Sequence, residues 1–140
     1  MTTAQPLFHL VKQLSNPAIA YGSDDPTHSR MVEAVMAVQA VKERGTATIN
    51  DIAQELRIDQ SGASRWMSQA IAAGLVQRER AASDGRAREC GLTRAGEELL
   101  EKARQWQEEM YLRLTADWSD EERTGFESGV QSILNSMVND

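Results

Sequence analysis

The chain has 140 residues, 41% of them hydrophobic, and a formal net charge of −6. This length fits one domain with an ordinary apolar core. No stretch approaches the ~20 consecutive apolar residues of a membrane span, the N-terminus carries no secretory signal pattern, and a single cysteine excludes an intramolecular disulfide. These observations predict a cytoplasmic protein.

The acidic total conceals an uneven distribution of charge. Residues 1–56 carry 4 basic and 6 acidic side chains, and residues 95–140 carry 4 basic and 11 acidic. Between them, residues 57–94 carry 7 basic and 4 acidic side chains, a balance of +3, and all seven bases are arginines. A local excess of arginine indicates a nucleic-acid contact surface, although a strongly basic domain would be stronger evidence.

The N-terminal part of the chain predicts two helices and a short strand. The first is a short amphipathic helix within residues 1–15, which is too short to be stable alone and must pack against another segment. A long helix with a broad apolar face follows from about Pro26 to Arg44. Residues 46–49 are β-prone and are expected to form a third small strand beside the hairpin described below.

Residues 50–73 contain two short amphipathic helical patterns joined by a tight connection. Asn50 is the expected N-cap of the first helix. Asp59 is expected to cap the second, from about Gln60 to Ala73, and Gly74 to end it. This second helix has exposed side chains suited to the major groove, since Arg binds guanine bidentately and Ser and Gln contact bases or phosphates. The candidate DNA-contacting residues here are Gln60, Ser61, Ser64, Arg65 and Gln69.

A hairpin is predicted immediately after these helices. Leu75–Arg80 is the first strand, and Ser83–Arg86 is a turn with Asp and Gly where a hairpin favours them. Arg86 lies at the tip and Arg88 on the return arm, and Cys90–Thr93 completes the hairpin. Thr93 is also expected to cap the helix that begins near Arg94. The order helix, helix, strand, turn, strand is typical of a winged helix-turn-helix.

Two longer helices follow the hairpin. The first runs from Arg94 to about Thr115 with a near-heptad apolar stripe, and a capping box at Ser119–Glu122 starts the last. The first stripe consists of Leu99, Ala103, Trp106, Met110 and Leu114, and the second of Phe126, Val130, Ile133, Leu134 and Met137.

The helix-turn-helix and the hairpin resemble the MarR family of winged helix-turn-helix transcriptional regulators. The residues that carry the resemblance are Ile52–Leu56, Ser61–Arg65, Gly74–Val76 and the segment from Asp84 to Gly96. The similarity covers roughly residues 30–100 by motif and is most specific in the spacing D-x-R-x5-L-T-x-x-G, from Asp84 to Gly96. Three residues depart from the family pattern. A basic residue is common at the position of Gln60, Trp66 is bulkier than the usual aliphatic residue, and Gly62 weakens its helix by up to ~1 kcal/mol relative to Ala.

The resemblance implies a mainly α fold with a small β-wing in a single domain spanning residues 1–140. Residues 30–94 would form the winged helix-turn-helix, with a recognition helix at about 60–73 and a wing at about 75–93. Residues 1–21 and 95–140 would interlock with a second copy. Two-fold dimers of this kind read half-sites about one helical turn apart on a pseudo-palindromic operator.

The resemblance also implies a mechanism. The protein would be a homodimeric repressor of transcription whose Arg86 and Arg88 enter the minor groove. A small aromatic or other lipophilic effector would change the separation of the two DNA-binding lobes and release DNA. Candidate effector-pocket residues are Phe8, Tyr21, Met31 and Met36, with simple core packing as the alternative for each.

Several residues have a second interpretation. Arg65 could be solvated or contact phosphate alone, and Arg86 could pair with Asp84 to hold the hairpin. Trp66 is interpreted as a packing residue rather than a stacking platform, and Cys90 as a buried filler rather than a redox switch.

Other classes of function are less well supported. His9 and His28 form no metal-ligand spacing with each other or with the cysteine, so no metal or cofactor is expected. There is no nucleophile–base pair, phosphate loop or metal motif, which argues against an enzyme. The acidic net charge leaves one alternative open: a winged-helix protein-interaction module that does not bind DNA.

Overall fold

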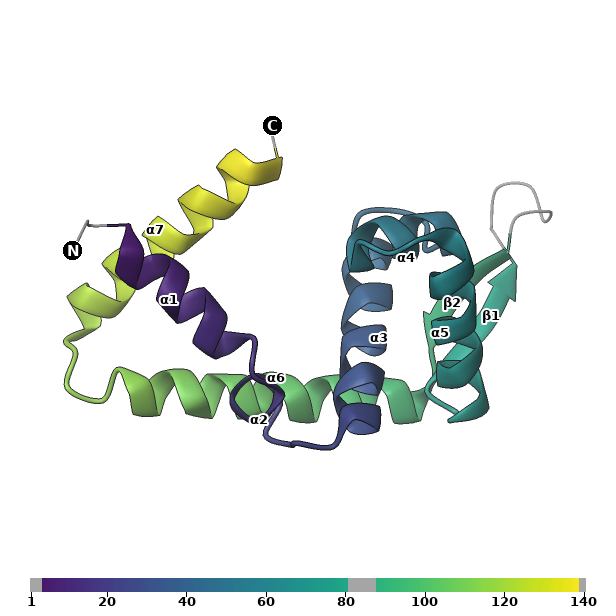
Figure 1. The fold of residues 1–140 in the computed structure, drawn as a ribbon, viewed down its shortest axis with the longest axis horizontal. Coiled ribbons are helices and arrows are strands. Elements are labelled where there is room, and N and C mark those ends of the chain that lie inside the picture. The colour runs from purple at the N-terminus through teal and green to yellow at the C-terminus, as the bar shows by residue number, and fades with distance from the viewer. Residues whose placement is uncertain (1–3, 81–87, 139–140) are drawn as a thin grey trace. The chain divides into compact units, whose positions relative to one another are not determined.

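The computed structural model describes residues 4–80 and 88–138, without the side chains of Arg80 and Arg88. These residues form a mainly helical fold with one small hairpin, which confirms the predicted fold class (Figure 1). The chain divides into two compact units, residues 1–107 and 108–140. The elements are α1 (Gln5–Leu14), α2 (Pro17–Ala20), α3 (Pro26–Glu43), α4 (Ile49–Leu56), α5 (Gln60–Ala72), β1 (Val76–Arg80), β2 (Arg88–Leu92), α6 (Arg94–Leu114) and α7 (Asp120–Val138).

The core of the first unit is built around α3. This helix packs against α4, α5 and β2, and α5 in turn packs against α4 and β1. Almost every turn of α3 has a buried valine, alanine or methionine, which is why a helix with so little amphipathicity is stable here. The cluster consists of Met31, Ala34, Val35, Val38, Val41, Ala47, Ile52, Met67, Ala70, Val76, Cys90 and Leu100.

The segment between α3 and α4 differs from the prediction in two respects. Thr48, not Asn50, is the N-cap of α4, and it forms a capping box with Asp51. The predicted third strand over residues 46–49 is wrong, because Ile49 already belongs to α4 and the sheet of the described residues has only β1 and β2. A backbone hydrogen bond, from Cys90 N to Ala47 O at 2.8 Å, joins this segment to the hairpin.

Helix α2 is held between α3 and α6. The Trp106 indole donates to Ile19 O at 2.9 Å, and the Gln107 amide donates to Ala20 O at 3.1 Å. Gly22 follows with φ 73°, and a Cβ there would lie 2.9 Å from the indole of Trp106. Glycine therefore satisfies both a left-handed backbone and a close approach at this position.

The wing connects to α6 through a compact junction. Thr93 Oγ1 donates to Gly74 O at 2.6 Å and accepts from Gly96 N at 3.1 Å, so it caps α6 as predicted. A Cβ on Gly96 would collide with the backbone carbonyl oxygen of Leu75. The L-T-x-x-G part of the motif thus joins the end of β2, the turn after α5 and the start of α6.

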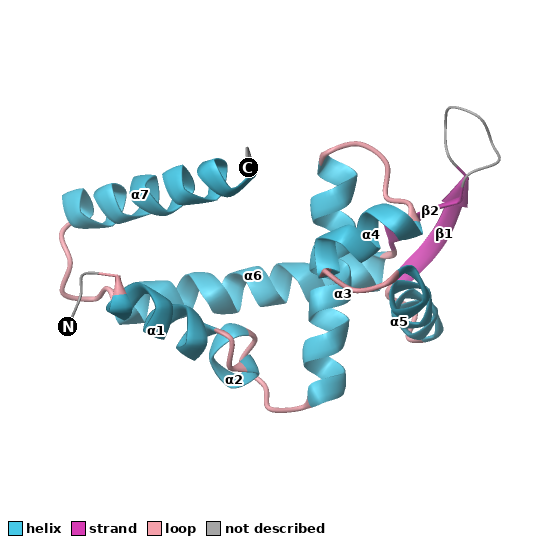
Figure 2. Cartoon of the chain, turned by 45° about the horizontal axis from the view of Figure 1, so that its top comes forward, coloured by secondary structure: helices cyan, strands magenta, loops and turns pink. Residues whose placement is uncertain are grey.

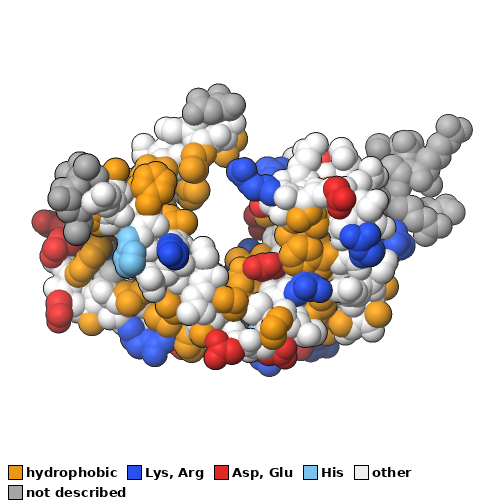
Figure 3. All heavy atoms as spheres, viewed as in Figure 1, with side chains coloured by type: hydrophobic (Ala, Val, Ile, Leu, Met, Phe, Trp, Pro, Cys, Tyr) orange, Lys and Arg blue, Asp and Glu red, His pale blue; other side chains and the backbone are white. Residues whose placement is uncertain are grey.

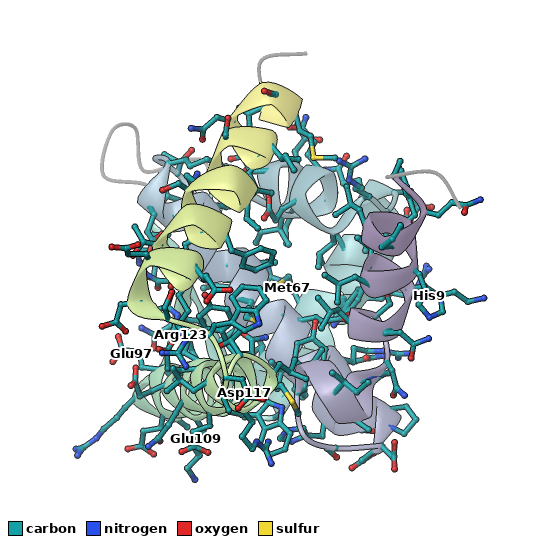
Figure 4. All side chains as sticks on the ribbon, turned by 90° about the vertical axis from the view of Figure 1, so that its left-hand side faces the viewer. His9, Met67, Glu97, Glu109, Asp117 and Arg123 are labelled. Carbon is teal, nitrogen blue, oxygen red and sulfur yellow. The ribbon has the colours of Figure 1, made fainter. Side chains whose placement is uncertain are left out.

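The second unit consists of the end of α6 and the helix α7. The predicted capping box is confirmed, since Ser119 and Glu122 exchange hydrogen bonds of 3.0 and 3.1 Å. Arg123 points from the start of α7 toward the end of α6, where it donates to Thr115 O at 2.8 Å (Figure 4). Trp118 meets Phe126 edge-on at a centroid distance of 5.4 Å.

Among the described residues, no helix is both long enough and apolar enough to cross a membrane.

Candidate nucleic-acid interface

The orientation of α5 is determined by its cap and its buried face. Asp59 accepts a 2.7 Å hydrogen bond from Gly62 N and caps the helix as predicted. A Cβ on Gly62 would lie 2.6 Å from this carboxylate oxygen, so glycine leaves room for the cap. Ala63, Met67 and Ala70 have no exposed surface and anchor the helix on the core.

This anchoring directs the opposite face of α5 to solvent. Gln60, Ser61, Arg65 and Gln69 are exposed, and Ser64 is half-buried. The predicted residues of this helix therefore share one accessible surface, with Ser64 at its margin. Ordered backbone, small hydroxyls and one long guanidinium give this surface hydrogen-bond donors and acceptors that can reach base edges.

The wing lies beside α5 (Figure 2). Strands β1 and β2 pair antiparallel, from Val76↔Leu92 to Arg80↔Arg88. Lys42 of α3 donates to Glu79 of β1 at 2.9 Å, and this bond lowers the pKa of the Glu79 carboxyl. The hairpin base is thus fastened to the core. The predicted turn at residues 83–86, including Arg86, lies outside the described residues, as does the side chain of Arg88, which begins β2.

Two arginines near α5 were not singled out from the sequence. Arg57, in the turn between α4 and α5, is exposed and has a left-handed backbone with φ 57°. An L-residue in this conformation is strained by roughly 1–2 kcal/mol. Its only sequence signal is the break in the apolar pattern after Leu56.

The second is Arg30 of α3. It lines a surface depression of about 370 Å³ together with Ile58, Asp59, Gly62, Arg65, Trp66 and Gln69. No sequence signal places Arg30 there, because it lies 36 positions before Trp66 in the chain. Trp66 itself packs partly against the core, as predicted, while its indole nitrogen contacts α3.

The four candidate effector-pocket residues lie in different surroundings in the described part of the chain. Phe8 is 70% exposed on α1, whereas Met31 belongs to the core cluster of α3 and Met36 packs against that cluster. Tyr21 donates a 3.2 Å hydrogen bond to Glu33 Oε1. Neither the depression beside α5 nor a smaller one of about 290 Å³ between α3 and α4 includes any of the four residues. The pocket stays a prediction.

Cys90 and His9 differ in their exposure to solvent. Cys90 is buried in β2, and this burial raises the pKa of its thiol, although nearby Arg78 opposes the shift. A thiol with a raised pKa is a poor nucleophile. His9 projects outward from α1 (Figure 4), and the described residues contain no group of three side chains that could hold a metal ion.

This arrangement is that of a winged helix-turn-helix protein. Helices α4 and α5 are joined by a short turn, α5 exposes one face, and the hairpin of β1 and β2 follows it. Residues 27–87 match the sequence profile of the MarR family, in agreement with the resemblance identified from the sequence.

Individual proteins are similar to this chain in sequence or in fold. The HTH-type transcriptional regulator YxaD of Bacillus subtilis (strain 168) is 26% identical over 103 residues, 74% of this chain and 72% of YxaD. The S. aureus MepR–DNA complex matches 97% of this chain and 99% of its own with a TM-score of 0.62 and 22% identity. S. aureus MepR bound to ethidium bromide matches 98% of this chain and 97% of its own, with a TM-score of 0.60 and 21% identity. Apo MarR from E. coli matches 96% of this chain and 98% of its own, with a TM-score of 0.67 and 18% identity. At these identities the solved structures are similar to the chain in fold.

Proposed function

We propose that this protein is a sequence-specific double-stranded DNA-binding regulator of transcription. The observation that carries the proposal is the exposed polar face of α5, anchored by three fully buried side chains and centred on Arg65. A rigid helix that presents serine, glutamine and arginine side chains outside a winged-helix core is suited to the major groove. The arginine-rich segment of residues 57–94 supplies positive charge where DNA would lie.

The relatives support this function. MepR has been captured in complex with DNA, and YxaD is named as a helix-turn-helix transcriptional regulator. In the proposed complex, α5 occupies the major groove, and Arg86 and Arg88 of the wing contact the adjacent minor groove.

We infer that the active form is a homodimer. Five apolar side chains on α1 are between 39% and 70% exposed within one chain: Leu7, Phe8, Leu10, Val11 and Leu14. Figure 3 shows hydrophobic side chains at the surface over α1. The stripe of α7 is also exposed, from 39% at Phe126 to 69% at Met137. A second copy would cover both helices, and two-fold symmetry would present two copies of α5 to a pseudo-palindromic operator.

The proposed regulatory response is repression that an effector relieves. By binding an operator the dimer would act as a repressor. MepR has been solved with ethidium bromide, a planar aromatic cation, which supports a lipophilic or aromatic effector here. An effector that binds one spacing of the two lobes better than another would shift the dimer away from DNA.

Replacing Arg65 tests the proposed reading surface. On a site selected from random duplexes, Arg65→Ala is expected to weaken binding by about 1–3 kcal/mol and to relax specificity at one position of each half-site. Arg104→Ala, which removes an exposed arginine from α6, is the matched control and should bind normally. A uniform loss across all sequences would instead make Arg65 a phosphate contact, and unchanged binding would remove α5 as the reader.

A protein-interaction module without DNA binding remains the alternative, favoured by the net charge of −6. Unchanged DNA binding by an Arg86→Ala variant would support this alternative.

A further inference from the structure

The depression beside α5 joins a residue of α3 to the proposed reading surface. Its lining includes Arg65 and Gln69 of that surface, and also Arg30, from the second turn of α3. Arg30 is exposed. The positive charge available to a ligand of α5 therefore extends beyond the helix-turn-helix itself.

Two contacts with Trp66 hold Arg30 in this place. The indole Nε1 donates to the backbone oxygen of Arg30 at 2.9 Å, which fixes the ring against α3. The guanidinium carbon of Arg30 lies 5.8 Å from the centre of the same ring, within the range of a cation–π contact. A guanidinium on an aromatic ring has its position restricted while its N–H donors remain available for another partner.

The charges around the depression leave it suited to an anion. Its one carboxylate, that of Asp59, already accepts the Gly62 N–H as the cap of α5. Among the residues that the structure describes, neither Arg30 nor Arg65 takes part in an ion pair. Two guanidinium groups from different helices thus border one depression without a carboxylate partner.

We propose that Arg30 is a DNA-contacting residue that binds a backbone phosphate at the edge of the major groove occupied by α5, and that Trp66 is its positioning residue. This inference rests on the proposed function, because it takes α5 to lie in the groove. The backbones run along both edges of the groove, so an arginine flanking α5 meets phosphate rather than base. Arg30 would contribute affinity and register, while Arg65 would contribute sequence specificity.

The salt dependence of binding distinguishes these roles. The salt slope, meaning the magnitude of the fall in log K per unit of log salt, decreases by about 0.9 for each phosphate contact that is lost. Arg30→Ala removes one contact from each copy in a dimer, so it should decrease the salt slope by about 1.8. Affinity should fall by the same factor on the selected site and on its single-base variants. Arg104→Ala, with the same loss of charge on α6, should leave the slope unchanged.

Variants of Trp66 test the positioning role. Trp66→Phe keeps an aromatic face under Arg30 and should retain most of the slope, whereas Trp66→Leu should lower it. In an Arg30→Ala background, Trp66→Leu should produce no further change in slope, an outcome that a merely structural role of Trp66 would not give. Circular dichroism confirms that each variant is folded.

The inference is overturned if Arg30→Ala binds the selected site with the wild-type slope, or if its loss of affinity depends on the base sequence. Either result leaves the proposed function intact, because wild-type binding is measured beside it. Failure of the wild-type chain to select any site would contradict the proposed function and this inference together.

Discussion

Gly96 is a tightly constrained residue, because a Cβ there would collide with the backbone carbonyl oxygen of Leu75. It lies where the first turn of α6 passes the backbone of Leu75, and Thr93 contacts both segments. Gly96→Ala forces a methyl group against a carbonyl oxygen that cannot rotate away, unlike the end of a flexible side chain. The free energy of unfolding is expected to fall by about 1–3 kcal/mol or more.

Urea denaturation followed by circular dichroism measures this loss. Gly125→Ala in α7 is the control, since a Cβ there meets nothing within 4 Å and helix propensity should stabilise it by up to about 1 kcal/mol. Equal effects of the two substitutions would show that the junction at Gly96 is not close-packed.

Residue types at helix ends were the most reliable sequence signals. Asp59, Thr93 and Ser119 cap the helices that they were predicted to cap, because each side chain satisfies backbone N–H groups within three residues of itself. The error at α4 has the same origin. Thr48 and Asn50 are both good N-cap residues. Thr48 is the cap in the structure because the Asp51 carboxylate accepts a hydrogen bond from Thr48 N and so completes a capping box.

Contacts between distant segments could not be predicted. The Arg30–Trp66 pair depends on where α3 crosses α5, and the residues between them contain no periodicity that fixes this crossing. Residues 46–49 do not form the predicted strand for a similar reason, since Thr48 caps α4 and Ala47 accepts a backbone hydrogen bond from Cys90 of the hairpin. The wing tip itself lies outside the described residues, so Arg86 stays a prediction.

At the scale of elements, Tyr21 and Glu33 join the end of α2 to α3. Partial burial, with Glu33 adding to its effect, raises the pKa of Tyr21 from 10.0 to about 12. A tyrosine whose pKa is raised on folding contributes stability that is complete below its unfolded pKa and is lost as pH rises through the folded pKa. Stability should therefore decline between pH 10 and about 12.

Tyr21→Phe removes this contribution. The unfolding free energy of the wild type should fall more steeply over that pH range than that of Tyr21→Phe, while all other alkaline groups are common to both proteins. Parallel curves from urea denaturation at a series of pH values would contradict the coupling of Tyr21 to Glu33.

At the scale of the whole molecule, the exposed apolar stripe of α7 predicts self-association. Ile133 is 46% exposed within one chain, and Ile133→Glu would place a charge in the proposed interface. Sedimentation equilibrium should then report the 15.5 kDa of one chain instead of twice that mass. Ser128→Glu adds the same charge on the opposite side of α7 and should remain dimeric. A wild-type monomer at all concentrations would contradict the dimer.

We propose that two copies of α5, held together in a dimer, read DNA. The most direct measurement is selection of binding sites by the wild-type protein from random double-stranded DNA at two salt concentrations. We expect a two-fold symmetric site whose half-sites lie about one helical turn apart, bound more weakly at the higher salt concentration. Weak retention of DNA without any preferred sequence would contradict it.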